Sequence, residues 1–180
     1  MHCALAETKS DSTSGGSKNI AFSALNNLDT ASLISHILER YHEVHRYQLE
    51  ALIPLAQRVE QVHADEDLVP SGLATHLQKM QFELEQHMQK EEQILFPMLQ
   101  QAFAPLPTRM IGGPIHVMRL EHNDHQDEIA QLMTLAHHFK LPEDACGTWQ
   151  ELNAKLQAFI EDLQTHIQIE NDVLFPRAER

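Results

Sequence analysis

Residues 82–97 read FELEQHMQKEEQILFP, and residues 161–176 read EDLQTHIQIENDVLFP. Aligned without a gap, the two stretches share a histidine, a glutamate four residues later, and a closing Leu-Phe-Pro. The shared pairs are His87 with Glu91 and His166 with Glu170. Because residues four apart lie one above the other on an α-helix, each copy presents an imidazole and a carboxylate on one face. Two such pairs on two helices predict a site for two metal ions.

The two copies belong to a chain whose apolar residues recur at helical spacing, without the alternation typical of strands. Pro54 is expected to kink the first helix, and Pro114 suits the first turn of the third. Four long helices with short connections predict an all-α fold, an antiparallel up-down-up-down four-helix bundle. Residues 1–28 are rich in Ser, Gly and Asn and are expected to form a flexible tail, with the bundle at 29–180. The expected helices span residues 30–62, 71–96, 114–139 and 144–174.

The composition excludes several classes of function. The chain carries 13 basic and 26 acidic residues, so its formal charge of −13 argues against nucleic acid as a partner. The two cysteines, Cys3 and Cys146, form no CxxC motif and support neither a disulfide framework nor a thiolate zinc site. No apolar run is long enough for a signal peptide core or a membrane span. A cytoplasmic location is therefore expected.

The duplication extends to the first and third helices. His42 and His45 in YHEVH correspond to His122 and His125 in EHNDH. Histidines from four helices can converge inside a bundle, and a carboxylate from each repeat can bridge two cations. The ligand types, imidazole and carboxylate without thiolate, favour iron; manganese is possible, and zinc in a closed four-coordinate site is the rival.

Other polar residues beside the repeat have two interpretations. Glu83 and Asp162 lie one helical turn before His87 and His166, where each can accept a hydrogen bond from a ligand imidazole or remain a solvated acid. His45 is displaced by about 300° around the helix from His42, and His125 has the same offset from His122. Both are therefore expected at the rim of the bundle rather than among the ligands.

The chain from about residue 30 to its end resembles the hemerythrin-like, HHE cation-binding superfamily, and within it the di-iron proteins that repair iron centres. The strings that carry this resemblance are RYHEVHRYQL at 40–49, RVEQVHAD at 58–65, HMQKEEQILFPM at 87–98, GGPIHVMRLEH at 112–122, EDACGTW at 143–149 and HIQIENDVLFPRA at 166–178. The resemblance implies a hemerythrin-like bundle that holds a non-haem, carboxylate-bridged centre of two iron ions. Matched string by string, the implied metal ligands are His42, His63, His87, Glu91, His122, His166 and Glu170, and Glu121 joins Glu83 and Asp162 as a neighbour of the site.

The same resemblance implies a function in the repair of iron–sulfur clusters damaged by nitrosative or oxidative stress, by iron donation or by nitric oxide chemistry. Iron–sulfur proteins are then the expected clients, and nitric oxide and oxygen the expected small ligands. Relatives often carry an N-terminal domain with a Cys-Cys pair, which this sequence is expected to lack. The alternatives are a nitric oxide or oxygen carrier or sensor without repair activity, and a structural zinc bundle. Whether the protein is an enzyme stays open.

Overall fold

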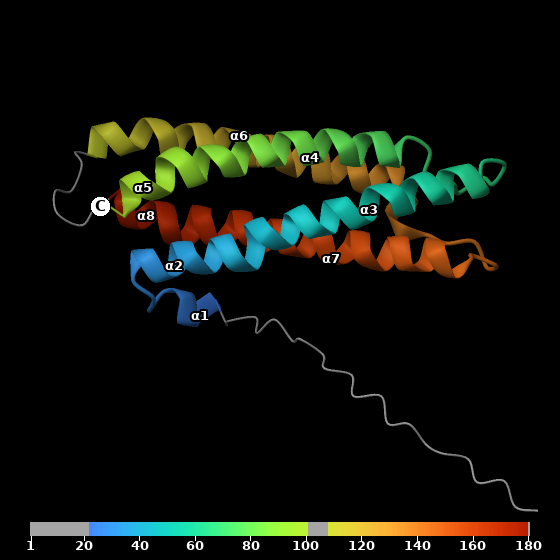
Figure 1. Cartoon of the computed structure of the whole chain (residues 1–180), viewed down its shortest axis with the longest axis horizontal. Helices are drawn as coiled ribbons and strands as arrows, with labels where there is room; N and C mark the ends of the chain where they lie inside the picture. Colours follow the sequence, from blue (N-terminus) through green and yellow to red (C-terminus); the bar gives the residue numbers. More distant parts are fainter. Residues whose placement is uncertain (1–21, 101–107, 180) are drawn as a thin grey trace, which may run out of the picture.

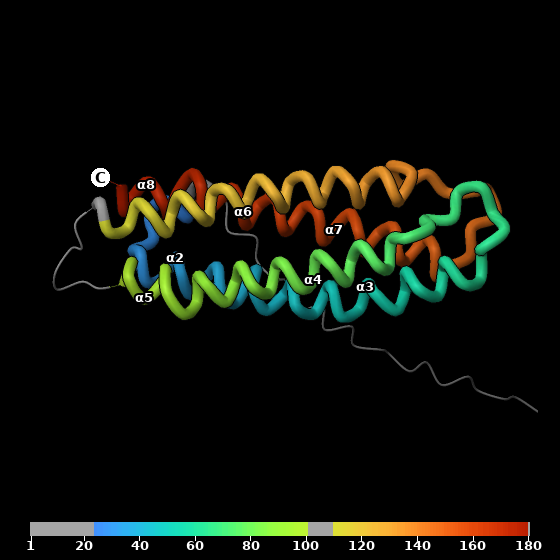
Figure 2. The backbone as a smooth tube through the Cα atoms, turned by 90° about the horizontal axis from the view of Figure 1, so that it is seen from above, coloured from blue at the N-terminus to red at the C-terminus, as the bar shows by residue number. Residues whose placement is uncertain are grey.

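The computed structural model describes residues 22–100 and 108–179, and in this part of the chain the fold is helical and contains no strand. Four long helical stretches run side by side and alternate in direction (Figures 1 and 2). A short helix, α1 (Phe22–Leu25), precedes them. The four stretches are α2 (Thr30–Ile37), η1 (Leu38–His42) and α3 (Glu43–Val62); α4 (Leu73–Lys90), η2 (Glu91–Leu95) and α5 (Phe96–Leu99); α6 (Thr108–Leu135); and α7 (Gly147–Ile169), η4 (Glu170–Leu174) and α8 (Phe175–Ala178). A single turn, η3 (His137–Phe139), follows α6.

The predicted all-α fold is confirmed, while several boundaries differ from the expected ones. Asp29 begins the first stretch as its N-cap, accepting a hydrogen bond from the backbone N–H of Ser32 at 2.8 Å. Pro54 lies inside α3, which continues to Val62, and Pro114 lies inside α6 rather than in its first turn. Packing of an amphipathic face on neighbouring helices outweighs the loss of one backbone hydrogen bond at each proline.

The wide turns η1, η2 and η4 are π-helical. In η2 the backbone N–H of Phe96 donates to the carbonyl of Glu91, five residues earlier, and in η4 Phe175 donates in the same way to Glu170. The proline that follows each phenylalanine has no N–H and would crowd the carbonyl four residues before it, so a wider turn relieves the clash. The sequence predicted that Leu-Phe-Pro would end the helix in each repeat. The helix instead continues, and its turn is widened at the glutamate.

The four stretches pack around a core with two apolar clusters. Each of α3 and α6 contacts both α4 and α7, which gives a bundle of antiparallel neighbours. One cluster surrounds Trp149 and Phe159 in the half of the bundle that holds most of α3 and α4. The other surrounds Phe96 and Phe175 in the half near α2, α5 and α8. Buried histidines and glutamates occupy the level between the clusters.

Part of the segment grouped with the tail packs on the bundle. Leu25 is buried in the cluster around Phe175, and Arg177 donates hydrogen bonds to the backbone carbonyls of Leu25, Asn26 and Leu28. Residues 22–28 therefore pack on the bundle beside α2, near the end that holds α5 and α8 (Figure 1). The flexible tail was expected for residues 1–28, and its first part, residues 1–21, lies outside the described residues.

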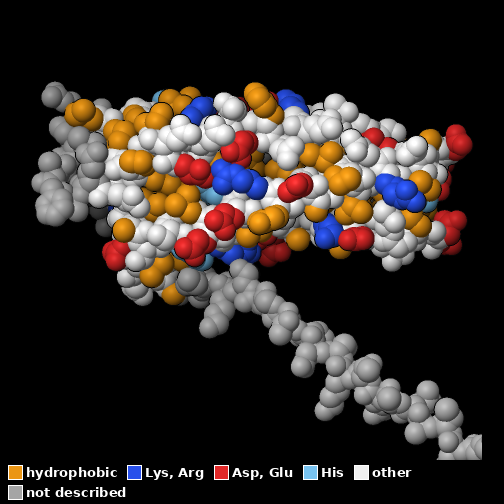
Figure 3. All heavy atoms as spheres, in the orientation of Figure 1, with side chains coloured by type: hydrophobic (Ala, Val, Ile, Leu, Met, Phe, Trp, Pro, Cys, Tyr) orange, Lys and Arg blue, Asp and Glu red, His pale blue; other side chains and the backbone are white. Residues whose placement is uncertain are grey.

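The surface shown in Figure 3 carries acidic and basic side chains next to one another rather than one extended basic field. Arg46 of α3, for example, donates to Glu85 at 2.8 Å and to Glu92 at 2.9 Å. This face offers no clustered cations for a phosphate backbone. Within the described ranges, every helix is too short or too polar to cross a membrane.

Candidate metal centre

Six histidines and two glutamates form a buried polar layer between the two apolar clusters. Each of the four long helical stretches contributes two of these residues, and every one is at most 4 % exposed. A layer this polar is costly inside a protein unless its donors and acceptors have partners. The residues are His42, His45, His87, Glu91, His122, His125, His166 and Glu170.

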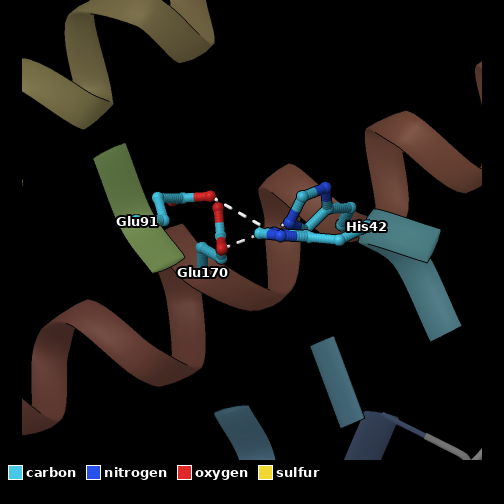
Figure 4. Close-up of side chains that lie close together, drawn as sticks. His42, Glu91 and Glu170 are labelled. Carbon is cyan, nitrogen blue, oxygen red and sulfur yellow. Dashed lines mark ion pairs between the residues drawn. The ribbon is translucent and has the colours of Figure 1, made fainter. Parts of the chain in front are cut away.

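Glu91 and Glu170 reach the same space from η2 and η4, beside the ring of His42 (Figure 4). The two oxygens of Glu91 face different histidines, with Oε2 at 3.3 Å from His42 Nε2 and Oε1 at 3.5 Å from His87 Nε2. Glu170 repeats this pattern. Its Oε2 lies 3.0 Å from His122 Nε2, and its Oε1 lies 3.2 Å from His166 Nε2. Each carboxylate can therefore bridge two cations.

The side chains form two groups that share both glutamates. Position A consists of His42 and His166 with Glu91 and Glu170, and position B of His87 and His122 with the same glutamates. In each group one ligand atom per residue lies within 4.8 Å of all the others. All four carboxylate oxygens, and Nε2 of His42, His122 and His166, are buried without a hydrogen-bond partner among the described residues. Unpaired lone pairs that converge in this way fit bound cations.

Burial lowers the pKa of His42, His45, His87 and His125 and so favours the neutral imidazole, which is the form that binds metal. Desolvation, together with the nearby His166 ring, lowers the pKa of His42 to about 2 and that of His45 to about 3. Desolvation and the ring of His87 lower the pKa of His125 to about 3. Burial and the neighbouring carboxylate of Glu170 raise the pKa of Glu91 well above its usual value. Two cations between the carboxylates would remove this repulsion.

The outer ring nitrogens of three ligands donate hydrogen bonds, so that their Nε2 lone pairs face the centre. His42 Nδ1 donates to Glu92 at 2.8 Å, and His122 Nδ1 donates to Asn171 at 3.0 Å. Glu92 and Asn171 each directly follow one of the two shared glutamates, so the two repeats place an acceptor at the same position.

The other two histidines of the groups, His87 and His166, are supported by residues that differ between the repeats. His87 Nδ1 donates to Glu121 at 2.9 Å, and this bond together with Lys90 lowers the pKa of Glu121 to about 2. The ring of His166 instead stacks on Tyr41, with centroids 5.4 Å apart. The prediction that Glu121 neighbours the site agrees with this placement.

His45 and His125, expected at the rim, lie inside the bundle. Their rings are 5.3 Å from the ring of His166 and 5.0 Å from that of His87, and the described residues offer no partner to either Nε2. Neither joins the two compact groups, so each is an adjacent imidazole on its own side of the centre. The repeated HxxH was a signal for them. The offset of about 300° around the helix was misleading, because the interior between the two apolar clusters is occupied by polar side chains.

The remaining predicted neighbours lie farther out. Asp162 accepts hydrogen bonds from Arg40 at 2.5 Å and from Gln48 at 2.7 Å, and Gln48 in turn accepts one from His45 at 3.1 Å. Asp162 thus supports His45 indirectly rather than a metal ligand directly. Glu83 Oε1 lies 3.8 Å from Lys79 Nζ, and among the described residues Glu83 pairs with no member of the buried layer.

The structure does not bring His63 to the centre, which corrects the ligand set implied by resemblance. His63 caps the far end of α3, 21 residues after His42, and a helix of that length spans roughly 30 Å. Its ring contacts Trp149, Cys146 and Glu66 instead. The match of the string RVEQVHAD therefore does not make His63 a ligand, because the length of α3 separates His63 from the buried layer.

A groove of about 520 Å³ opens above position B, between α4 and α6. Its lining includes His125, which borders the centre, and Glu121, which supports His87. Phe82, Glu83 and Lys90 form part of its outer wall. The groove therefore reaches from the surface to residues that border the buried layer.

Comparisons with known proteins agree with this geometry. The chain is 45% identical over 148 residues to the iron-sulfur cluster repair protein YtfE of Musicola paradisiaca, covering 82% of this chain and 65% of that protein. It is 48% identical over 144 residues to the iron-sulfur cluster repair protein DnrN of Neisseria gonorrhoeae, covering 80% and 88%. A probable iron-sulfur cluster repair protein of Haemophilus influenzae is 42% identical over 147 residues, covering 82% and 64%.

The chain thus spans somewhat less than two thirds of the length of the Musicola and Haemophilus relatives. The model of the hemerythrin HHE cation binding domain matches residues 33–178, from the first helical stretch to the end of α8. That range contains every residue of the buried layer. The chain belongs to the hemerythrin HHE cation-binding domain family.

Proposed function

We propose that this protein binds two iron ions between Glu91 and Glu170 and acts in the repair of damaged iron–sulfur clusters. The observation that carries the proposal is the sharing of both glutamates by two four-residue groups. Relatives named as iron-sulfur cluster repair proteins, matched over most of this chain, support the biological assignment.

The donor set favours iron over the rival metals. Each position offers two imidazole nitrogens and two carboxylate oxygens, and neither includes a thiolate. Mixed nitrogen and oxygen ligands suit iron, whereas two closely spaced four-ligand groups exceed what one structural zinc ion requires. Bound iron would supply reversible one-electron chemistry and exchangeable coordination positions.

Different residues would have different roles in binding the ions. Glu91 and Glu170 would neutralise charge between the two positions, and the buried imidazoles would supply nitrogen ligands. Glu92, Glu121 and Asn171 fix ring orientation from outside. Because these ligands are protonatable oxygen and nitrogen donors rather than thiolates, iron held here is suited to transfer to a client cluster.

Nitric oxide and oxygen are the small ligands that we propose for the centre, with the groove at His125 and Glu121 as their path. The same groove supports the second candidate function, a carrier or sensor of a diatomic gas. Optical titration of the reduced protein separates the two functions, since a carrier forms a reversible adduct and keeps its iron.

The deciding experiment combines metal analysis with a repair assay. Protein purified without oxygen should contain two irons per chain, with the Mössbauer signature of a coupled pair. Added to aconitase with a damaged cluster, it should restore more activity than the same amount of free ferrous iron. Glu91→Gln should abolish the gain, while the surface variant Glu50→Gln should keep it. Recovery equal to that from free iron would reject the repair role, and one zinc per chain would reject the centre itself.

A further inference from the structure

A second cluster of reactive side chains lies at the opposite end of the bundle from α5 and α8. Cys146 precedes the first residue of α7, and His63 follows the last residue of α3. The Sγ of Cys146 lies 3.1 Å from Nε2 of His63, and the other ring nitrogen of His63 donates to Glu66 at 2.5 Å. Thiol, imidazole and carboxylate therefore form a continuous chain of hydrogen bonds.

This order of groups is the one that activates a cysteine nucleophile. A carboxylate that accepts from one ring nitrogen fixes the tautomer of the imidazole, and the other nitrogen can then take the thiol proton. Trp149 holds the ring of His63 in place, with centroids 4.8 Å apart. The orientation of the imidazole is thus set on two sides, by Glu66 and by Trp149.

The surroundings also favour the charged pair. Backbone N–H groups at the start of α7, chiefly that of Trp149, and then the His63 ring lower the pKa of the Cys146 thiol. The bonds to Glu66 and then to Cys146 raise the pKa of His63. Both shifts act in the same direction and favour transfer of the thiol proton from Cys146 to His63. Cys146 is only partly buried, so a reagent in solvent can reach the sulfur.

We propose that Cys146, His63 and Glu66 form a peroxide-reactive thiol site, at which hydrogen peroxide oxidises Cys146 to a sulfenic acid. The thiolate sulfur attacks one peroxide oxygen, so an S–O bond forms as the O–O bond breaks. Sulfur loses two electrons and the peroxide gains them. The proton of the His63 imidazolium passes to the departing hydroxide, which leaves as water, and His63 becomes neutral. A free thiol in solution can then convert the sulfenic acid to a mixed disulfide.

The site does not depend on the metal centre or on the proposed repair function. The length of α3 places His63 roughly 30 Å from His42 along the helix. Metal content therefore serves as an independent measure that a variant of this site has folded. It also means that a failure of the thiol site and a failure of the iron centre give different results.

The first test measures the alkylation rate of Cys146 by iodoacetamide as a function of pH, in a Cys3→Ser background so that one thiol reports. An ordinary thiol is only about 3 % thiolate near pH 7. Cys146 should react with an inflection below that of an ordinary thiol, and His63→Gln should slow it by roughly tenfold near pH 7. Glu66→Gln should shift the rate in the same direction by less, and the neighbouring acid variant Asp65→Asn should match the parent.

The second test adds hydrogen peroxide with dimedone and locates the adduct by mass spectrometry. The parent should carry the adduct on Cys146, and His63→Gln should carry several-fold less after the same exposure. Iron content and helical circular dichroism should stay at parental levels in His63→Gln and in Glu66→Gln. If His63→Gln loses helix content, the comparison of Glu66→Gln with Asp65→Asn decides instead. An ordinary thiol inflection in the parent, or no dimedone adduct on Cys146, would overturn the proposal.

Discussion

The two candidate metal positions, A and B, each take one histidine from each half of the internal repeat, and they differ in what surrounds those histidines. Each has two histidines and shares both glutamates. At position A, His42 donates to the carboxylate of Glu92 while His166 stacks on Tyr41. At position B, His87 donates to the carboxylate of Glu121 while His122 donates to the amide of Asn171. Each position thus has one histidine backed by a negative charge and one backed by a neutral group.

The difference shows which parts of a repeat are tied to binding. Direct ligands must keep their donor atoms, whereas a supporting residue needs only to orient a ring, which an aromatic face, an amide or a carboxylate can do. The surroundings also differ in access, because the groove beside His125 and Glu121 lies on the side of position B. We therefore expect position B to exchange ions and bind small ligands faster than position A.

The largest expected effect comes from breaking the feature that both positions share. Glu91→Gln or Glu170→Gln should reduce the metal content at A and B together, because each side chain contacts both groups. Loss of tightly bound ions should lower the free energy of unfolding by about 4 kcal/mol, or the Tm by roughly 10 °C. Calorimetry with elemental analysis measures both quantities.

The control for this prediction is the metal-free protein, in which the substitution should no longer lower the free energy of unfolding. With a chelator present, Glu91→Gln should be at least as stable as the parent, because it removes one of two adjacent buried carboxylates. A variant that keeps two ions per chain would contradict the bridging role.

The second effect concerns the buried imidazoles of the metal-free protein. In the folded state the pKa is about 2 for His42 and about 3 for His45 and His125, below the ordinary 6.5. The unfolded chain therefore takes up protons as pH falls below about 6.5, and stability must fall with it. Each group contributes about 1.4 kcal/mol per pH unit, so the loss reaches roughly 4 kcal/mol at one unit below 6.5.

Glu91 opposes this trend, because a raised pKa stabilises the folded state at low pH and loses that effect as pH rises. Three imidazoles outweigh one carboxyl, so the net stability should still fall on acidification. Urea unfolding with chelator at two pH values on either side of 6.5 measures it. His45→Gln and His125→Gln should each weaken the pH dependence, and equal stability at both pH values would contradict the neutral state of these rings.

A third, smaller effect separates the positions. His42→Ala should empty position A and leave the ion at B, whereas His122→Ala should do the reverse. About one ion per chain should remain in each variant, with about half of the stability loss expected for Glu91→Gln. Mössbauer spectra should then show one uncoupled iron. Loss of both ions from either variant would show that the two positions fill only together.

The smallest effect tests the supporting residues. Glu92→Gln and Glu121→Gln each remove the negative charge behind one histidine, and each should weaken the affinity of its own position by about tenfold. Asn171→Asp should strengthen position B by a similar factor, because it adds a charge behind His122. Competition with a metal-binding dye measures these affinities. Equal affinities in all three variants would show that ring orientation alone matters.

Most of the fold and the inner part of the site could be predicted from the repeat. His87 with Glu91 and His166 with Glu170 share a helical face by spacing alone, and the structure brings both pairs together. The π-helical turns were not predictable in the same way, since they balance proline against packing from neighbouring helices. The rim position expected for His45 and His125 was wrong because it used angle on one helix and ignored the other three.

The sequence by itself determined that this chain is helical and carries paired imidazole and carboxylate side chains, because these properties depend only on residues within a few turns. Alignment of residues 82–97 with residues 161–176 also showed the duplication. Tertiary structure alone decided which histidines meet. It brought His45 and His125 into the polar layer, and it carried His63 to Cys146 and Glu66 at the other end. The reason is that spacing within one helix sets only the face on which each side chain lies. The packing of the helices against one another sets which residues of different helices lie at the same level.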